Sequence, residues 1–375
     1  MRQNRFFHLA TAVMLAICIS GCEKETPKEP VTPPDPDPTP VPEIVEIERI
    51  TLSEQSLRLA VGENAALTVA VEPAEAKDSA VTWLSTAADV ASVNDRGEIS
   101  AVSKGEALII AECGNKKDTC AVTVYEPAKI GDWYYSDGTW SSEMEDGKEI
   151  IGIVFYTGDP TSQDPALKAD FPGCTNGLAV SLTADEGRSS WQAEYQSYWD
   201  LEEGFVGRWA EANVPDYASI SSGIEPEDNL NRILGYNNTK VLEAFNAAAE
   251  NAAWPANIMD KVHSFRSEVS APETSSGWYL PSVKELSLLC AGEFDGNIRD
   301  ISDIMISNRE IIDAKIEEAG GTAFQGMGYL SSTEYWKEGE EDAYSYAFRV
   351  RFEDGATIQN LKDNARYRVR MILAF

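Results

Sequence analysis

Between Ile44 and Glu126 the sequence alternates apolar and polar residues in short stretches, and this period restricts the region to β-structure. The alternation is clearest at Leu67, Val69 and Val71. Gly, Asn, Asp or Pro interrupts it about every 8–12 residues, which is the spacing of short antiparallel strands. We therefore predict an all-β sandwich over residues 44–126.

The strand around Trp83 and the residues that follow it resemble a known domain family. The stretch GEISAVSKGEA lies farther along the chain after that strand, and together they resemble the bacterial Ig-like domain, group 2. This family also occurs in the invasin and intimin adhesins. The resemblance implies that Trp83 is a core residue and that the domain acts as a spacer or contact module.

The N-terminus has the order of features of an export signal. Basic residues precede an apolar run, and Ser20 and Gly21 precede Cys22. The run is shorter than the roughly 20 residues of a membrane span. The residues from Ile19 to Cys22 resemble a bacterial lipobox, with Ile19 where Leu is usual. The resemblance implies a lipoprotein signal peptide over residues 1–21 and an outer-membrane lipid anchor on Cys22. The alternative is an ordinary secretory signal with a chance cysteine.

Residues 22–43 cannot form a packed core, because they are almost entirely Pro, Thr, Asp, Glu and Lys. Prolines favour the extended polyproline II conformation, so this linker spans roughly 60–70 Å at about 3.1 Å per residue. The acidic and lysine-containing run after Cys22 loosely resembles surface-export signals of Bacteroidetes lipoproteins. We expect a stalk that holds an exported, surface-exposed protein away from the membrane.

Charge and composition argue against several classes of function. The formal net charge is −31, and such a surface repels nucleic acid. After the signal peptide only His263 remains as a histidine, which disfavours zinc sites and histidine-dependent catalysis. The sequence has no phosphate-binding loop. We predict no metal site, no cofactor, no nucleic-acid partner and no catalysis.

Residues 127–375 combine strands and helices, which predicts an α+β domain. The stretches GKEIIGIVFYTG and CTNGLAVSLTAD have the composition of buried strands, and the middle of the region has helical periodicity. Ser282 and Glu285 form a capping-box pattern at the start of one helix. A second helix, NREIIDAKIEEAGG, ends in glycine. Strands follow as far as the C-terminus.

Several segments of this region resemble the DUF1566 family of bacterial surface proteins. The likeness lies in GWYLPSVKELSLL, YLSSTEYW and the final 33 residues, with GDWYYSDGTWS resembling the opening of Bacteroides members. This family includes the C-terminal domain of the Legionella collagen-like adhesin, and the resemblance implies a C-type-lectin-like fold. The calcium-binding motifs of lectins are missing; the nearest string is EPEDN at 225–229. The reactive C-terminal cysteine pair of formylglycine-generating enzymes is also missing.

Four cysteines fall within the two expected domains. Cys113 and Cys120 bracket a polar turn, so we expect them to form a disulfide across a hairpin. Cys174 and Cys290 are either a disulfide between a strand and a helix or two buried thiols, and we favour the disulfide.

Aromatic residues supply the best candidates for ligand contact, because flat rings stack on sugar C–H surfaces. Trp191, Tyr195 and Trp199 would share one face of a helix, although packing of this face against a sheet is the favoured alternative. The other candidates are Trp209, Glu334, Tyr335 and Trp336, the last three lying before a polar stretch.

The segment GDWYYSDGTW at 131–140 is rich in aromatic residues, and we interpret it as a strand and turn. Alternation places Trp133 and Tyr135 on one face and Tyr134 on the other. As in lectin-like folds, we expect this first strand to pair with the last one.

Together these features predict a lipid-anchored cell-surface protein that binds a glycan or an extracellular protein. Two alternatives remain: a carbohydrate hydrolase that uses a pair of carboxylates, and a structural subunit of a surface appendage.

Overall fold

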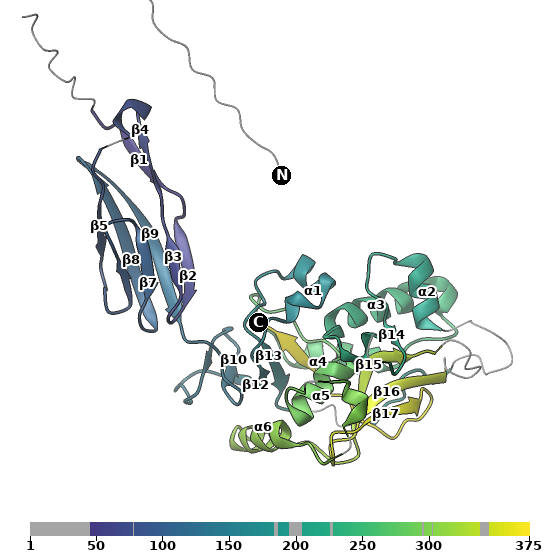
Figure 1. The fold of residues 1–375 in the computed structure, drawn as a ribbon. Helices are drawn as coiled ribbons and strands as arrows, with labels where there is room; N and C mark the ends of the chain where they lie inside the picture. The colour runs from purple at the N-terminus through teal and green to yellow at the C-terminus, as the bar shows by residue number, and fades with distance from the viewer. Residues whose placement is uncertain are drawn as a thin grey trace, which may run out of the picture.

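The computed structural model describes residues 46–77, 79–183, 187–194, 205–225, 228–294, 296–301, 303–337 and 345–375. Two regions follow each other along the chain, an elongated β-sandwich and a larger mixed region (Figure 1). None of the helices within the described ranges is both long enough and apolar enough to cross a membrane.

The first region is the β-sandwich that the alternating sequence predicts. One sheet has the order β2-β9-β8-β5 and a second the order β3-β7-β6, with β1 and β4 forming a separate pair. Strand β8 alternates buried and more exposed residues along its length. The strands are β1 (Arg49–Leu52), β2 (Ser56–Ala60), β3 (Asn64–Ala66), β4 (Val69–Glu72), β5 (Thr82–Ser85), β6 (Ala91–Val93), β7 (Glu98–Ala101), β8 (Gly105–Cys113) and β9 (Lys116–Tyr125).

Trp83 is half-buried and packs against the core of the sandwich. Gly97 lies against its ring, and a Cβ atom at that position would come within 2.6 Å of both the indole and the Leu67 carbonyl oxygen. Gly97 also has a φ of +79°, which residues other than glycine rarely adopt. The glycine of the family-like stretch is therefore required by the packing of the tryptophan.

The expected disulfide between Cys113 and Cys120 is absent, and both residues are buried free thiols. Cys113 lies opposite Lys116 in the β8–β9 hairpin, whereas Cys120 lies opposite Ile109. The turn is therefore only two residues long, and the two cysteines lie four positions apart along the ladder. At about 3.3 Å per residue this separation is roughly 13 Å, about twice the reach of a disulfide.

Cys174 and Cys290 are also free thiols, which corrects the favoured disulfide. The Cys174 thiol donates to the Thr274 carbonyl and the Cys290 thiol to the Met305 carbonyl. Burial raises the pKa of Cys174 to about 11 and that of Cys290 to about 12.

The second region contains two sheets joined by helices (Figure 1). The five-stranded sheet has the order β11-β10-β12-β13-β18 and is antiparallel; the four-stranded sheet has the order β14-β15-β16-β17, with β14 parallel to β15. The strands are β10 (Trp133–Tyr135), β11 (Trp140–Ser141), β12 (Ile150–Tyr156), β13 (Leu178–Ser181), β14 (Ser221–Ser222), β15 (Tyr329–Tyr335), β16 (Tyr346–Val350), β17 (Thr357–Leu361) and β18 (Ile372–Ala374).

Six α-helices accompany these sheets in the described part of the chain. They are α1 (Pro165–Asp170), α2 (Val206–Asn213), α3 (Gly235–Ala247), α4 (Ile258–Glu268), α5 (Val283–Ala291) and α6 (Ser307–Glu318). The two stretches expected as buried strands form β12 and β13. Helix α6 ends next to Gly320, which has a φ of +75°, as its sequence indicates.

The first strand of this region, β10, does not pair with the last strand, β18, because β12 and β13 lie between them. This corrects the expected pairing. The ring of the C-terminal Phe375 nevertheless contacts Tyr134, with 4.7 Å between centroids. Trp133 and Tyr135 enter one hydrophobic core and Tyr134 the other, so the predicted alternation is confirmed.

Contacts at the junction connect the two regions. The Trp140 indole N–H donates to the Glu126 carbonyl at 2.9 Å. The Arg58 guanidinium lies 4.6 Å from the centroid of the Tyr125 ring and 5.4 Å from that of the Trp140 ring. Such cation–π contacts favour a fixed arrangement of the two regions.

Helix α5 begins with the capping box that the sequence predicts. The Glu285 carboxylate accepts from the Ser282 backbone N–H at 2.6 Å and from the Tyr279 hydroxyl at 3.0 Å. It is fully buried, and burial raises its pKa from 4.5 to about 7, with the Asp164 carboxylate adding to the rise.

We expect Glu285→Gln to stabilise the protein above neutral pH and to have little effect near pH 5. A carboxyl group with a raised pKa in the folded state contributes stability that is present below its unfolded value of 4.5 and is lost as the pH rises through about 7. The difference between the two proteins should reach on the order of 3 kcal/mol. Urea unfolding at a series of pH values measures it; a pH-independent difference would contradict the prediction.

We also expect all four described cysteines to react with a thiol reagent after denaturation without reductant. Under native conditions they should be protected, because all four are buried. Mass spectrometry of the labelled peptides measures both states. A peptide map that shows Cys113 linked to Cys120, or Cys174 linked to Cys290, would disprove this expectation.

Candidate functional site

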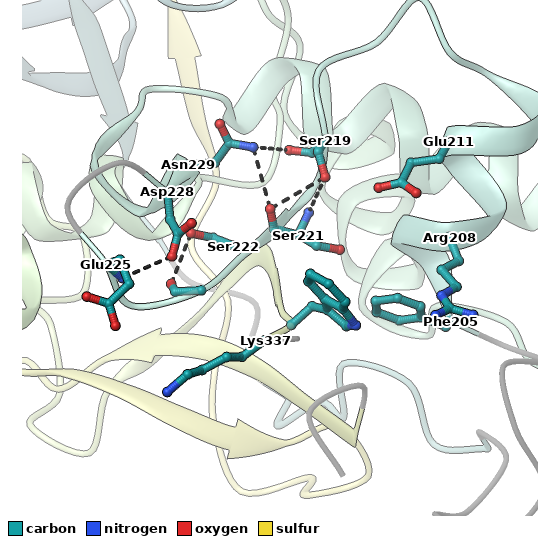
Figure 2. Close-up of a pocket in the computed structure, with 12 residues that line it drawn as sticks. Phe205, Arg208, Glu211, Ser219, Ser221, Ser222, Glu225, Asp228, Asn229 and Lys337 are labelled. Atoms are coloured by element: carbon teal, nitrogen blue, oxygen red, sulfur yellow. Dashed lines mark hydrogen bonds between the residues drawn. The ribbon is translucent and has the colours of Figure 1, made fainter. Parts of the chain in front are cut away.

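A cleft opens between α2, β14 and the end of β15. Its volume is about 640 Å³. Figure 2 shows Arg208 and Glu211 projecting from α2 on one side, with Glu225 and Asp228 on the opposite side. Its lining residues are Phe205, Arg208, Glu211, Ser219, Ser221, Ser222, Gly223, Glu225, Asp228, Asn229, Trp336 and Lys337.

The polar wall of the cleft is held by local hydrogen bonds (Figure 2). The Asn229 side-chain amide donates to the Ser219 carbonyl at 3.0 Å, and the Asp228 carboxylate accepts from the Glu225 backbone N–H at 2.9 Å. The backbone N–H of Trp336 donates to the Ser222 carbonyl at 3.0 Å. These bonds fix the loop after β14 beside the residue that follows β15.

Beneath this wall, the buried Glu334 carboxylate connects three segments. It accepts from the Gly207 backbone N–H at 2.7 Å, from the Ser221 hydroxyl at 2.9 Å and from the Val206 backbone N–H at 3.2 Å. It also forms a salt bridge with Lys362. A carboxylate is favoured there because the first N–H groups of a helix have no partner within the helix.

Gly207 allows this close approach of α2. A Cβ atom at this position would come within 2.0 Å of the Ser221 hydroxyl oxygen and 2.9 Å of the Glu334 carboxylate. The helix that carries Arg208 and Glu211 is therefore placed by a backbone contact that a larger residue would obstruct.

Lys362, the partner of Glu334, is also fully buried. Its ammonium group lies 4.9 Å from the centroid of the Trp191 ring and 5.5 Å from that of the Phe205 ring. Burial lowers the pKa of Lys362, and the Glu334 charge opposes this effect.

The structure places most of the candidate ligand residues away from solvent. Trp191 is fully buried, outside any helix, and its indole N–H donates to the Ser331 carbonyl at 3.0 Å. Glu334 and Tyr335 are buried because β15 is covered on both faces. Their side chains therefore contact the protein interior and not the cleft.

The remaining candidates have different positions. Trp336 is 37% exposed and lines the cleft. Trp209 is half-buried, its ring packs edge-on against Phe245, and its N–H donates to the Glu250 carboxylate at 3.2 Å. Tyr195, Trp199 and the predicted lipidation residue Cys22 lie outside the described residues.

Sequence reasoning missed the cleft residues of α2 and of the loop after β14. Arg208 and Glu211 precede and follow Trp209 in an ordinary amphipathic helix, and no motif distinguishes them. Within the described ranges, no group of three or more His, Cys, Asp or Glu side chains is arranged to hold a metal ion.

Comparisons with known proteins assign the first region. Residues 46–124 match the model of the bacterial Ig-like domain, group 2, close to the expected limits of 44–126. A stretch of 84 residues is 37% identical to an Ig-like virion protein of Serratia phage KSP90, covering 22% of this chain and 33% of that protein.

Two further similarities involve Bacteroides ovatus. A proposed fimbrium tip subunit, Fim1C, is 31% identical over an alignment of 183 residues that covers 43% of this chain and 32% of that protein. The chain thus spans about a third of the length of the curated relatives that it matches. The crystal structure of a fimbrial protein superimposes with a TM-score of 0.51 at 19% identity, covering 87% of this chain and 71% of the other.

At this low identity the structural likeness concerns the fold alone. The β-sandwich at residues 46–124 is a bacterial Ig-like domain of group 2, and the chain that contains it has the fold of a fimbrial protein.

Proposed function

We propose that this chain is a non-catalytic, adhesive subunit of a cell-surface appendage, and that its cleft binds a glycan. The similarity to a proposed fimbrium tip subunit supports a role in such an appendage. The cleft supports recognition as the role of the region after the Ig-like domain.

The observation that carries the proposal is the chemistry of the cleft. Trp336 is partly exposed there, and an aromatic face packs against the C–H surface of a sugar. Serine hydroxyls, the Asn229 amide and the carboxylates of Glu211 and Glu225 surround it, and these groups exchange hydrogen bonds with sugar hydroxyls. The volume of the cleft, about 640 Å³, also lies in the range of small-ligand sites.

The charge of the protein indicates which glycans suit the site. A formal net charge of −31 repels polyanions at a distance. Arg208 and Lys337 balance part of the acidic lining. We therefore propose neutral glycans, in preference to sulfated or sialylated ones.

We propose a domain arrangement with the limits predicted from the sequence. Residues 44–126 form a spacer, residues 127–375 form a lectin-like head, and Cys22 attaches the chain to the outer membrane through the linker at 22–43. The contacts of Arg58 with Tyr125 and Trp140 support a spacer that orients the head.

We expect Trp336→Ala to weaken glycan binding at least tenfold, or about 1.4 kcal/mol, without changing the melting temperature by more than a few degrees. The substitution removes the ring that the sugar packs against, and the side chain is not part of the buried core. A glycan array identifies the ligand, and calorimetry with the best binder, with and without calcium, measures the affinity.

Ile304→Ala is the matched control, because Ile304 is 73% exposed and does not line the cleft. Its affinity should equal that of the wild type. Equal binding by Trp336→Ala would place recognition elsewhere. Release of sugar from the ligand would instead support a hydrolase, and a blank array with co-purifying surface proteins would support a structural subunit.

A further inference from the structure

Three polar side chains meet in the interior below the cleft. Gln192, Glu334 and Lys362 are each fully buried. The Lys362 amino group contacts the Glu334 carboxylate and lies 3.4 Å from the side-chain oxygen of Gln192. An amine, a carboxylate and a carboxamide are thus held together in a site closed to solvent.

Burial shifts Lys362 toward its neutral, nucleophilic form. The Trp191 and Phe205 rings lie beside the amino group, and removal from water disfavours an ammonium ion. A lysine desolvated in this way becomes a nucleophile. Glu334 is positioned to take its proton, because the two groups are in direct contact.

The carboxamide of Gln192 is held at both ends. Its nitrogen donates to the Trp254 carbonyl at 2.6 Å, while its oxygen faces Lys362. The backbone N–H groups of Trp191 and Gln192 both donate to the Lys362 carbonyl, at 2.8 and 3.1 Å. The two segments are therefore fixed side by side. The Lys362 amino group lies 3.4 Å from the oxygen of the carboxamide whose carbonyl carbon it would attack, and such fixed proximity favours reaction.

We propose that Lys362 and Gln192 become joined by an intramolecular isopeptide bond, with Glu334 carrying the proton. Glu334 accepts a proton from the Lys362 ammonium, and the freed amine forms a bond to the side-chain carbonyl carbon of Gln192. The bond from that carbon to the amide nitrogen breaks. The departing nitrogen takes a proton from Glu334 and leaves as ammonia. The new amide nitrogen then gives its extra proton to Glu334, which passes it to the ammonia, so that the products are the isopeptide and an ammonium ion and no oxidant or cofactor is needed.

This bond neutralises the buried lysine, whose charge is costly to hold away from water. It also closes a loop between positions 170 residues apart. The linked segments lie directly behind α2 and β15, which form the cleft. The proposal is independent of the ligand, because it concerns the chemistry of the interior alone.

Mass spectrometry of the purified wild-type protein tests the proposal. We compare it with Gln192→Met, which removes the acyl group and keeps a similar volume. After correction for the substitution, the wild type should be about 17 Da lighter, the mass of ammonia. Digestion should yield one branched peptide that contains both Gln192 and Lys362.

Glu334→Gln should also lack the mass deficit, because the proton carrier is gone. Glu318→Gln, in the exposed pair with Lys315, is the matched control and should retain the deficit. An unchanged wild-type mass would overturn the proposal, even if every variant failed to fold. A deficit of about 18 Da, the mass of water, with a peptide that links Glu334 to Lys362 would overturn the assignment to Gln192.

Discussion

The carboxylate of Glu334 is the interaction on which the arrangement of the cleft depends. It receives two backbone N–H groups of α2, the hydroxyl of Ser221 on β14 and the ammonium of Lys362. Helix α2, strand β14 and the segment after β17 are therefore positioned relative to β15 by one buried group. Because a buried charge without partners is costly, these segments are expected to keep their arrangement together.

The cleft is consequently a surface feature with a rigid base. Trp336 directly follows β15, and its backbone is bonded to Ser222. An exposed residue of the cleft lies only one or two positions along the chain from buried residues that stabilise its base. Trp336 is partly exposed, whereas Glu334 and Tyr335 are buried. Sequence inspection grouped these three residues as candidates, and only their burial separates them.

Local patterns predicted the elements that local physics controls. Alternation identified the strands of the sandwich and the opposite faces of Trp133 and Tyr134, and the capping box identified the start of α5. The expected disulfide between Cys113 and Cys120 is absent, because the spacing of two cysteines does not determine the register in which the two strands of the hairpin pair. A two-residue turn places Cys113 opposite Lys116, and four more residues of turn would have been needed to place it opposite Cys120.

By itself, the sequence determined the sandwich of the first region, strands β12 and β13 and helices α5 and α6 of the second region, and the strongly acidic composition. These properties depend on period, capping and composition, which are local or additive. Only the tertiary structure decided the strand order β11-β10-β12-β13-β18, the burial of Trp191 and the meeting of Gln192, Glu334 and Lys362. These contacts join residues up to 196 positions apart, as in the pairing of Leu178 with Ala374. Their formation depends on how whole elements pack, which no short window of sequence records.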